Sequence, residues 1–312
     1  MKAAQINEYG HADVLKIADV PVPAVSEGKV LVAVHASSIN PFDTVIREGY
    51  MKDMIPLTFP VTLGGDIAGV ITEVGDGVSE LKVGDKVYGQ ANVVAGNSGA
   101  FAEFAVTAAG QLATTPKDLD FDQAASLPLV GVSALQGIID HIHLQSGQKI
   151  FIHGGAGGIG SMAIQIAKHL GAFVATTATG EGVAFVKSLG ADEVIDYKAE
   201  DFTEKLRDYD AVFELAGGEE FEKSLTVLKK GGIGVSMIAH ADEAKVKELG
   251  VTAISQQTQV TTDHLHALTK LVEDGVVTPQ VEKVYPLEQI QQAFKARESG
   301  SVRGKVVIHI KD

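Results

Sequence analysis

The chain has 312 residues, a formal net charge of −14, 45% hydrophobic residues and no cysteine. This length corresponds to about two ordinary globular domains. The negative charge argues against binding to a nucleic-acid backbone, and the missing cysteines exclude disulfides, thiol nucleophiles and cysteine-bound zinc. No apolar run approaches the roughly 20 residues that span a bilayer, and the first residues lack a signal-peptide pattern. We therefore expect a cytoplasmic protein with no membrane and no nucleic-acid partner.

The first part of the chain is predicted to be mostly β-structure. Apolar, β-branched runs at 29–34 and 66–75 alternate with turn residues such as Pro21, Pro23 and Asp76-Gly77. Many short strands separated by regular turns favour a small barrel or sandwich over a parallel sheet.

From about residue 123 the pattern changes to alternating strands and helices. A strand at 148–153 and a helix at 159–170 are followed by strand candidates between helical segments, at 173–177, 193–197, 210–215, 233–237 and 251–255. This alternation predicts an α/β fold with a doubly wound parallel sheet. The last segments break the alternation and are expected to return to the first domain: helix 262–274, extended 281–285, helix 287–299 and strand 305–310. The predicted domains are 1–122 with 260–312, and 123–259.

A glycine cluster follows the first strand of the parallel region. Gly155, Gly157 and Gly160 match the G-x-G-x-x-G spacing, with a strand before them and a helix after them. Glycine lets the backbone approach a pyrophosphate, and the helix N-terminus supplies amides and partial positive charge. The expected dinucleotide contacts are Gly155, Ala156, Gly157, Gly158, Ile159 and Gly160. A merely structural turn is the alternative, whereas a nucleoside-triphosphate loop fails because no lysine precedes Ser161.

The end of the second parallel strand indicates which nicotinamide coenzyme is bound. Sites selective for NAD place an acid there, but this strand ends Thr176-Thr177-Ala178-Thr179 and the next acid is Glu181. A 2′-phosphate is then not repelled, and Thr177 and Thr179 are candidate contacts, although both also suit a plain β-strand. The prediction is NADPH.

Six sequence blocks in the same order carry a family resemblance. They are 38–43 (SINPFD), 63–70 (LGGDIAGV), 81–87 (LKVGDKV), the glycine cluster, 189–197 (LGADEVIDY) and 303–307 (RGKVV). The chain resembles the zinc-free quinone oxidoreductase (zeta-crystallin-like) branch of the medium-chain dehydrogenase/reductase superfamily. The resemblance implies a GroES-like β-rich catalytic domain, a Rossmann domain, a small-molecule substrate and an oligomer, which we expect to be a homodimer.

The resemblance also predicts that catalytic zinc is absent. Zinc-dependent relatives have a cysteine where Asn40 stands and a histidine at the position of Gly65. Neither residue suits that site, and the structural zinc of those relatives needs four cysteines. The histidines at 35, 141, 143 and 153 lack companions at ligand spacing and are expected to be surface or packing residues.

By resemblance, Asn40, Asp43 and Tyr50 lie around the nicotinamide and the substrate. Asn40 would orient a carboxamide or a water, or else serve as a turn residue before Pro41. Tyr50 would stack on the substrate or polarise its carbonyl, or else pack on the surface. Asp43 is expected to make local hydrogen bonds.

The remaining coenzyme contacts implied by the resemblance are in the second domain. They are Ser133 and the segment Met237, Ile238 and Ala239 near the nicotinamide, and Tyr197 near the adenosine. As a bare residue, Tyr197 is a strand end. Gly182 stands where relatives often carry a lysine that binds the 2′-phosphate, which is a departure from the family pattern.

The expected chemistry is direct hydride transfer to a quinone or an α,β-unsaturated carbonyl. Conjugated acceptors need no Lewis acid, because hydrogen-bond donors can meet the delocalised charge that develops on their oxygen. A serine hydrolase is disfavoured because no G-x-S-x-G motif is present. The alternative is an NADPH-binding regulatory or interaction protein with the same fold and little turnover, since a fold does not fix an activity.

Overall fold

The computed structural model describes residues 1–312, which form two compact units. Unit 1 comprises Met1–Leu129, Val260–Glu273 and Pro279–Asp312, and unit 2 comprises Val130–Gln259 and Asp274–Thr278. Both chain termini therefore belong to unit 1. The domain boundaries given above stay a prediction.

Unit 1 is built on two β-sheets. The smaller sheet has the order β2 (Lys16–Asp19), β1 (Lys2–Ile6), β4 (Val61–Thr62). The larger sheet contains β15 (Val281–Pro286), β16 (Lys305–His309), β3 (Lys29–Ser38), β5 (Asp66–Val74), β6 (Lys86–Gln90) and β8 (Leu112–Thr114) in this order, and β7 (Phe104–Ala108) also pairs with β3. The C-terminal strand β16 lies antiparallel to β3, with Val307 opposite Ser38. Residues from both ends of the chain therefore share one sheet.

Unit 1 contains four complete helices, one of which carries predicted site residues at its start. They are α1 (Pro41–Glu48), α2 (Phe121–Ala125), α9 (Thr262–Glu273) and α10 (Ile290–Glu298), with 3-10 turns at Ala12–Val14, Val93–Ala95, Ala109–Gln111 and Leu287–Gln289. Helix α1 begins with Pro41 in the first turn, and the Asp43 carboxylate accepts the Asn40 amide at 2.7 Å. It ends at Gly49, whose φ of +76° favours glycine. Helix α1 was not predicted from the sequence.

Unit 2 contains a six-stranded, fully parallel sheet, which confirms the predicted α/β fold with a doubly wound sheet. Its order is β11 (Glu193–Asp196), β10 (Phe173–Ala178), β9 (Lys149–His153), β12 (Tyr209–Glu214), β13 (Leu228–Ser236) and β14 (Thr252–Ser255). The middle residues of the two central strands, Ile150–Ile152 and Ala211–Phe213, are apolar and buried because both faces of the sheet are covered.

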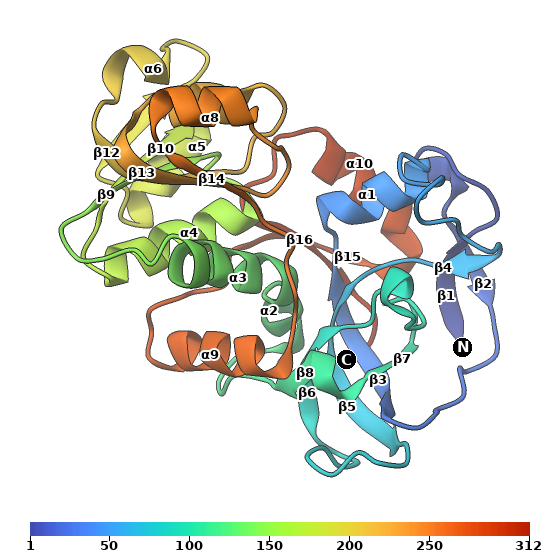
Figure 1. Cartoon of the computed structure of the whole chain (residues 1–312). Helices are drawn as coiled ribbons and strands as arrows, with labels where there is room; N and C mark the ends of the chain where they lie inside the picture. The colour runs from blue at the N-terminus through green and yellow to red at the C-terminus, as the bar shows by residue number, and fades with distance from the viewer. The chain divides into compact units, whose positions relative to one another are not determined.

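Helices lie on both faces of this sheet, with α4 on one side and α8 on the other (Figure 1). The helices are α3 (Pro128–Leu135, which begins in unit 1), α4 (Gly158–His169), α5 (Glu181–Ser188), α6 (Phe202–Lys205), α7 (Glu220–Leu225) and α8 (Glu243–Leu249). A π-helical segment, Gln136–His141, continues α3. No helix of the chain combines the length and apolar composition needed to cross a bilayer.

Candidate functional site

The glycine cluster forms the tight turn between β9 and α4. A side-chain carbon added at Gly155 would lie 2.1 Å from Thr176 Oγ1, and one added at Gly160 would lie 2.3 Å from the carbonyl oxygen of Gly154. Such contacts are far inside van der Waals distance, so only glycine fits at these two positions. Gly154 has a φ of +93°, which glycine adopts without strain. Gly155 and Gly160 are thus buried within the turn, whereas Gly157 is exposed and Ala156 and Gly158 are half-buried.

Helix α4 begins immediately after this turn and directs its first amides outward from the sheet edge. The first-turn amides of a helix have no intrahelical acceptor, and the helix dipole adds partial positive charge there. The first turn of α4 contains no acidic residue, and its last turn carries Lys168 and His169. This arrangement suits a diphosphate.

The threonines at the end of β10 hold the glycine turn in place. Thr177 Oγ1 accepts the Gly154 amide at 2.9 Å, and Thr176 Oγ1 donates to the Ile152 carbonyl at 2.6 Å. Both side chains are buried, whereas Thr179 is half-buried in the loop before α5. Of the two predicted threonine contacts, Thr177 supports the turn and Thr179 is the more accessible to a ligand.

The start of α5 lies beside the glycine turn. A side-chain carbon at Gly182 would be 3.4 Å from Ala156 Cβ and 3.5 Å from Ala178 Cβ, which is ordinary contact. Tyr197, which follows β11, is 55% exposed. Gly182, which stands where relatives carry a lysine, and the predicted contact Tyr197 both lie at the carboxyl edge of the parallel sheet, where open α/β sheets bind ligands.

The predicted nicotinamide segment follows β13 at the same edge. Ile238 is 61% exposed, while Met237 and Ala239 are half-buried. Ser133, predicted to lie near them, is fully buried in α3, and its hydroxyl is 2.6 Å from Thr258 Oγ1. The Ser133 side chain is thus engaged within the protein.

In unit 1, Asn40 belongs to a buried network of charged and polar groups. Its Nδ2 donates to Asp66 Oδ2 at 2.8 Å, and its Oδ1 accepts from Lys305 Nζ at 2.5 Å. Asp66 Oδ2 also accepts the Ser38 hydroxyl at 3.0 Å, and its Oδ1 accepts Gln90 Nε2 at 3.1 Å. One hydrogen on the Asn40 amide nitrogen remains after these contacts.

Burial shifts the pKa of two ionisable groups in this network. It raises the pKa of Asp43 well above its ordinary value, and it lowers the pKa of Lys305. Tyr50 is very different, since it follows the end of α1 and is 75% exposed. The structure therefore buries Asn40 and Asp43 and leaves Tyr50 open to solvent.

Two family models match the chain. The "Alcohol dehydrogenase GroES-like domain" model covers residues 26–117, and a "Zinc-binding dehydrogenase" model covers residues 189–308. The "NADPH-dependent alkenal/one oxidoreductase, chloroplastic" of Arabidopsis thaliana is 36% identical over 99% of this chain and 79% of its own length. The quinone oxidoreductase structure from Coxiella burnetii has a TM-score of 0.93 at 34% identity, covering 100% of this chain and 99% of that one.

The chain belongs to the zinc-free quinone oxidoreductase branch of the medium-chain dehydrogenase/reductase superfamily. The GroES-like and Rossmann assignments are thereby confirmed. A further structure of this family, the Escherichia coli quinone oxidoreductase complexed with NADPH, has a TM-score of 0.90 at 26% identity, covering 99% of this chain and 100% of that one.

Several buried polar residues of this chain were not recognised from the sequence. Asp66 and Lys305 lie inside the quoted sequence blocks but were not assigned a role, and Glu214 and Ser236 were taken as strand residues. The available signal was an acid inside or at the end of an apolar strand, as in Ala211-Val212-Phe213-Glu214. Such an acid is seldom fully buried unless it has partners.

The position that holds a zinc-binding cysteine in related dehydrogenases faces a cation in this chain. Asn40 Oδ1 contacts the Lys305 ammonium, and a side-chain carbon added at Gly65 would lie 3.6 Å from both Gln90 Nε2 and Asn92 Nδ2. No group of three or more histidine, cysteine, aspartate or glutamate side chains in the chain is placed to hold a metal ion.

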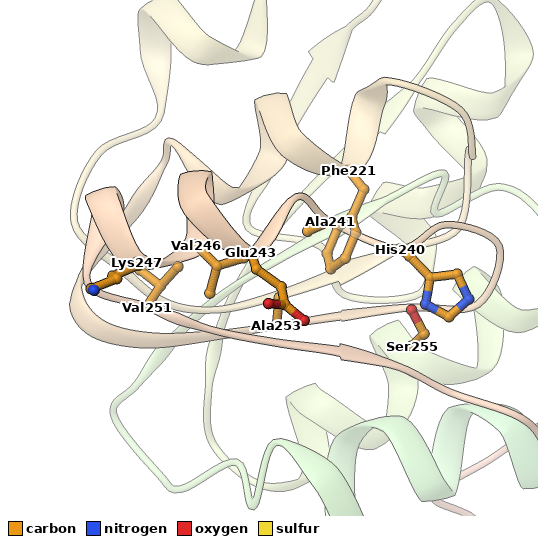
Figure 2. Close-up of a pocket in the computed structure, with 9 residues that line it drawn as sticks. All are labelled: Phe221, His240, Ala241, Glu243, Val246, Lys247, Val251, Ala253 and Ser255. Atoms are coloured by element: carbon orange, nitrogen blue, oxygen red, sulfur yellow. The ribbon is translucent and has the colours of Figure 1, made fainter.

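A separate hollow of about 490 Å³ lies in unit 2 between α8 and β14, as Figure 2 shows. Val246 and Ala253 contribute apolar surface, while His240 lies beside Ser255 at one end. Phe221, Ala241, Glu243, Lys247 and Val251 complete its lining. None of the glycine-turn residues lines it, so this hollow is distinct from the predicted coenzyme site.

Proposed function

We propose that this chain is an NADPH-dependent oxidoreductase that reduces quinones or α,β-unsaturated carbonyls by direct hydride transfer without a catalytic zinc. The observation that carries the proposal is the glycine turn, in which Gly155 and Gly160 leave no room for a side-chain carbon. A backbone cradle followed by a helix N-terminus fits the diphosphate of a dinucleotide. The similarity to NADPH-dependent and quinone-reducing relatives supports the choice of coenzyme and substrate.

The residues that would hold NADPH come from several loops at one sheet edge. The amides of Ala156 and of Gly158 to Gly160 would bind the diphosphate, since the Gly157 amide already donates to the Gly154 carbonyl at 3.2 Å. The start of α5 would lie at the 2′-phosphate, and the 237–239 segment would contact the nicotinamide. NADPH supplies the hydride when it is bound. The protein orients the coenzyme and the acceptor and excludes water, which reduces the entropic part of the barrier.

The buried network of unit 1 supports a reaction without zinc. A divalent cation beside Asn40 would stand next to the Lys305 ammonium, which already occupies the Asn40 oxygen. Charge repulsion between two cations in a buried site is costly. Conjugated acceptors suit such a site because donors such as the second Asn40 N–H and the exposed Tyr50 hydroxyl can meet the charge on their oxygen. We therefore propose Asn40 and Tyr50 as catalytic residues.

The function is tested by mixing purified protein with NADPH and a panel of quinones, enals, enones and saturated alcohols. We expect NADPH oxidation with the conjugated acceptors, no turnover of alcohols with NADP+, and less than stoichiometric zinc by metal analysis. Tight NADPH binding without turnover of any acceptor would instead favour the regulatory protein considered above. Stoichiometric zinc would contradict the zinc-free reaction.

The preference for NADPH over NADH should increase when a cation is placed at the start of α5. Gly182→Lys adds a side chain where a β-carbon meets only ordinary contacts. A charge-assisted hydrogen bond to the 2′-phosphate is worth about 1.5–3 kcal/mol, so the ratio of NADPH to NADH affinity should rise about 10-fold or more. Titrations with both coenzymes measure the ratio. Gly182→Met is the uncharged control, and an equal gain with methionine would show that charge is not the cause.

We also propose that the protein is a homodimer that pairs through the edge strand β14. Gln256 donates its amide to the Ser236 carbonyl of β13 at 2.8 Å. Amides of successive strand residues point in alternate directions, so Ile254 faces β13 and Ala253 faces outward. An exposed strand edge is a ready partner for a second copy.

Ala253→Pro should weaken such a dimer while leaving the β13 pairing intact. Proline removes an outward amide, and a symmetric pair loses that hydrogen bond in both copies, which weakens association about 10-fold. Sedimentation over a range of concentrations measures the dimer constant, with Ala253→Ser as the control that keeps the amide. A monomeric wild type, or an unchanged dimer in the proline variant, would rule out this edge.

A further inference from the structure

A carboxylate is buried at the centre of the carboxyl edge of the parallel sheet in unit 2. Glu214, the last residue of β12, is fully buried and forms no ion pair with lysine or arginine. Its nearest titratable neighbour is His153, at 4.0 Å, and burial lowers the pKa of that histidine. A buried ionised carboxylate is costly unless hydrogen bonds satisfy it, so the partners of Glu214 reveal why it is there.

One oxygen of Glu214 holds the loop that follows its own strand. Glu214 Oε1 accepts the amides of Ala216 at 2.6 Å and Gly217 at 2.7 Å. Gly217 and Gly218 have φ angles of +89° and +67°, so the chain reverses sharply around the carboxylate. These short, charge-assisted bonds fix the course of residues 215–218.

The other oxygen holds the loop after the neighbouring strand through a serine. Glu214 Oε2 accepts the Ser236 hydroxyl at 2.9 Å, and Ser236 Oγ accepts the amides of Ile238 at 3.1 Å and Ala239 at 3.0 Å. The Met237 amide donates to the Glu214 carbonyl at 3.2 Å. Every amide of the 237–239 segment is therefore bound by Glu214 or by the serine that Glu214 orients.

The register of the sheet places Glu214 between the loops of the predicted coenzyme site. Glu214 is opposite His153, which precedes the glycine turn, on one side and opposite Ser236 on the other. The carboxyl ends of three adjacent strands thus form one row, and each of the three loops begins just beyond it. In an open α/β sheet this edge is where the ligand binds.

We propose that Glu214 is a positioning residue for the coenzyme, acting through the 215–218 and 237–239 loops. This inference rests on the proposed binding of NADPH at this edge. Preorganised loops bind more tightly because less conformational freedom is lost on association. An ionised carboxylate is required, because it accepts at both oxygens, whereas a glutamine amide has one accepting oxygen and one donating nitrogen.

Two variants distinguish the hydrogen bonds of Glu214 to the 215–218 loop from its link through Ser236 to the 237–239 segment. Glu214→Gln keeps the size of the side chain but can accept on only one side. Ser236→Ala keeps the carboxylate and its bonds to Ala216 and Gly217, and it removes only the link to the 237–239 segment. Because Ser236→Ala is the milder change, it keeps the test valid even if Glu214→Gln does not fold.

A matched control lies at the other end of the same strand. Asp210, the second residue of β12, accepts the Lys149 amide at 2.8 Å and pairs with Lys229. It therefore stabilises the amino edge of the sheet with the same chemistry, far along the strand from the coenzyme loops. Asp210→Asn should lower the Tm without changing NADPH affinity.

The test measures NADPH Kd from the fluorescence of bound NADPH, the KM for NADPH and for a quinone, kcat and Tm, for all four proteins. We expect Glu214→Gln to raise the NADPH Kd and KM at least ~10-fold and Ser236→Ala at least ~3-fold, from the loss of charge-assisted and neutral hydrogen bonds respectively. The quinone KM at saturating NADPH should stay within about twofold. A general loss of stability would lower the active fraction, and so the apparent kcat, without raising the KM for NADPH.

The measurements distinguish a failure of the positioning role of Glu214 from a failure of the proposed function. If the wild type binds NADPH and folded Ser236→Ala binds it equally well, the positioning role is wrong while the proposed function stands. An increase in Kd for Asp210→Asn that matches its loss of Tm would also overturn it, since stability alone would then explain the effect. If the wild type does not bind NADPH at all, the proposed function itself fails.

Discussion

Replacing Gly160 by alanine should raise the NADPH Kd by about 100-fold or more. The added carbon would lie 2.3 Å from the Gly154 carbonyl oxygen and 2.6 Å from Gly155 Cα, both backbone atoms that cannot rotate away. The turn must therefore open, which displaces several amides from the diphosphate at about 1.5–3 kcal/mol each. Calorimetry or NADPH fluorescence measures the loss, and binding equal to wild type would contradict the assigned cradle.

Gly157→Ala provides the matched comparison in the same turn. A side-chain carbon at Gly157 would have the Gly154 carbonyl oxygen as its nearest neighbour, at an ordinary 3.5 Å, and its φ of −76° suits alanine. We expect the Tm to remain that of the wild type. If Gly157→Ala still binds NADPH more weakly, the cause is a steric contact between the added methyl group and the ligand. In Gly160→Ala the cause is instead a distortion of the turn itself.

Lys305→Met should destabilise the protein by about 3–5 kcal/mol, because it leaves a buried carboxylate without its cation. Lys305 Nζ lies 3.6 Å from Asp66 Oδ2 and also donates to the carbonyl of Ile39 and the side chain of Asn40. Both ions are buried, with side-chain exposures of 3% and 0%. Urea unfolding followed by circular dichroism measures the effect.

The double variant Lys305→Met with Asp66→Asn distinguishes an ion pair from simple packing. Removing both charges eliminates the unpaired carboxylate, so the double variant should be more stable than Lys305→Met alone. Additive losses would show that Lys305 contributes only through its hydrocarbon chain. Lys305→Arg is less informative, since the larger guanidinium would not fit the same buried space.

The parts of the structure that sequence predicted are those governed by local rules. The strands of the parallel sheet were found because burial on both faces requires short apolar runs, as in Ile150–Ile152 and Ala211–Phe213. The glycine turn was found because its spacing is fixed by contacts within about six residues. Helix α1 was missed, because Asn40-Pro41 was taken as a turn, although proline is favoured in a first helical turn and Asn40 caps it.

The buried polar networks could not be predicted, because their partners are distant in sequence and depend on strand register. Glu214 meets Ser236 only because β12 and β13 align in register, and Asn40 meets Lys305 across 265 positions. The same limit applied to Thr177, predicted as a ligand contact, since only the structure shows its hydroxyl engaged with Gly154. Residue type indicated polarity at these positions, but not the partner.

Because unit 1 is interrupted in the sequence, it can complete its folding during synthesis only after most of unit 2 has been made. Nearly all of unit 2, Val130–Gln259, is one continuous stretch, whereas unit 1 needs segments on both sides of it. Strand β16 carries Lys305, whose ammonium contacts Asn40 and lies near Asp66. Lys305 is therefore synthesised after both of these partners and after the continuous stretch of unit 2. Nascent chains that end before residue 305 should therefore contain a folded unit 2, while the larger sheet of unit 1 lacks β16 and its Asp66 carboxylate lacks a cation. We expect chaperones to bind such incomplete chains.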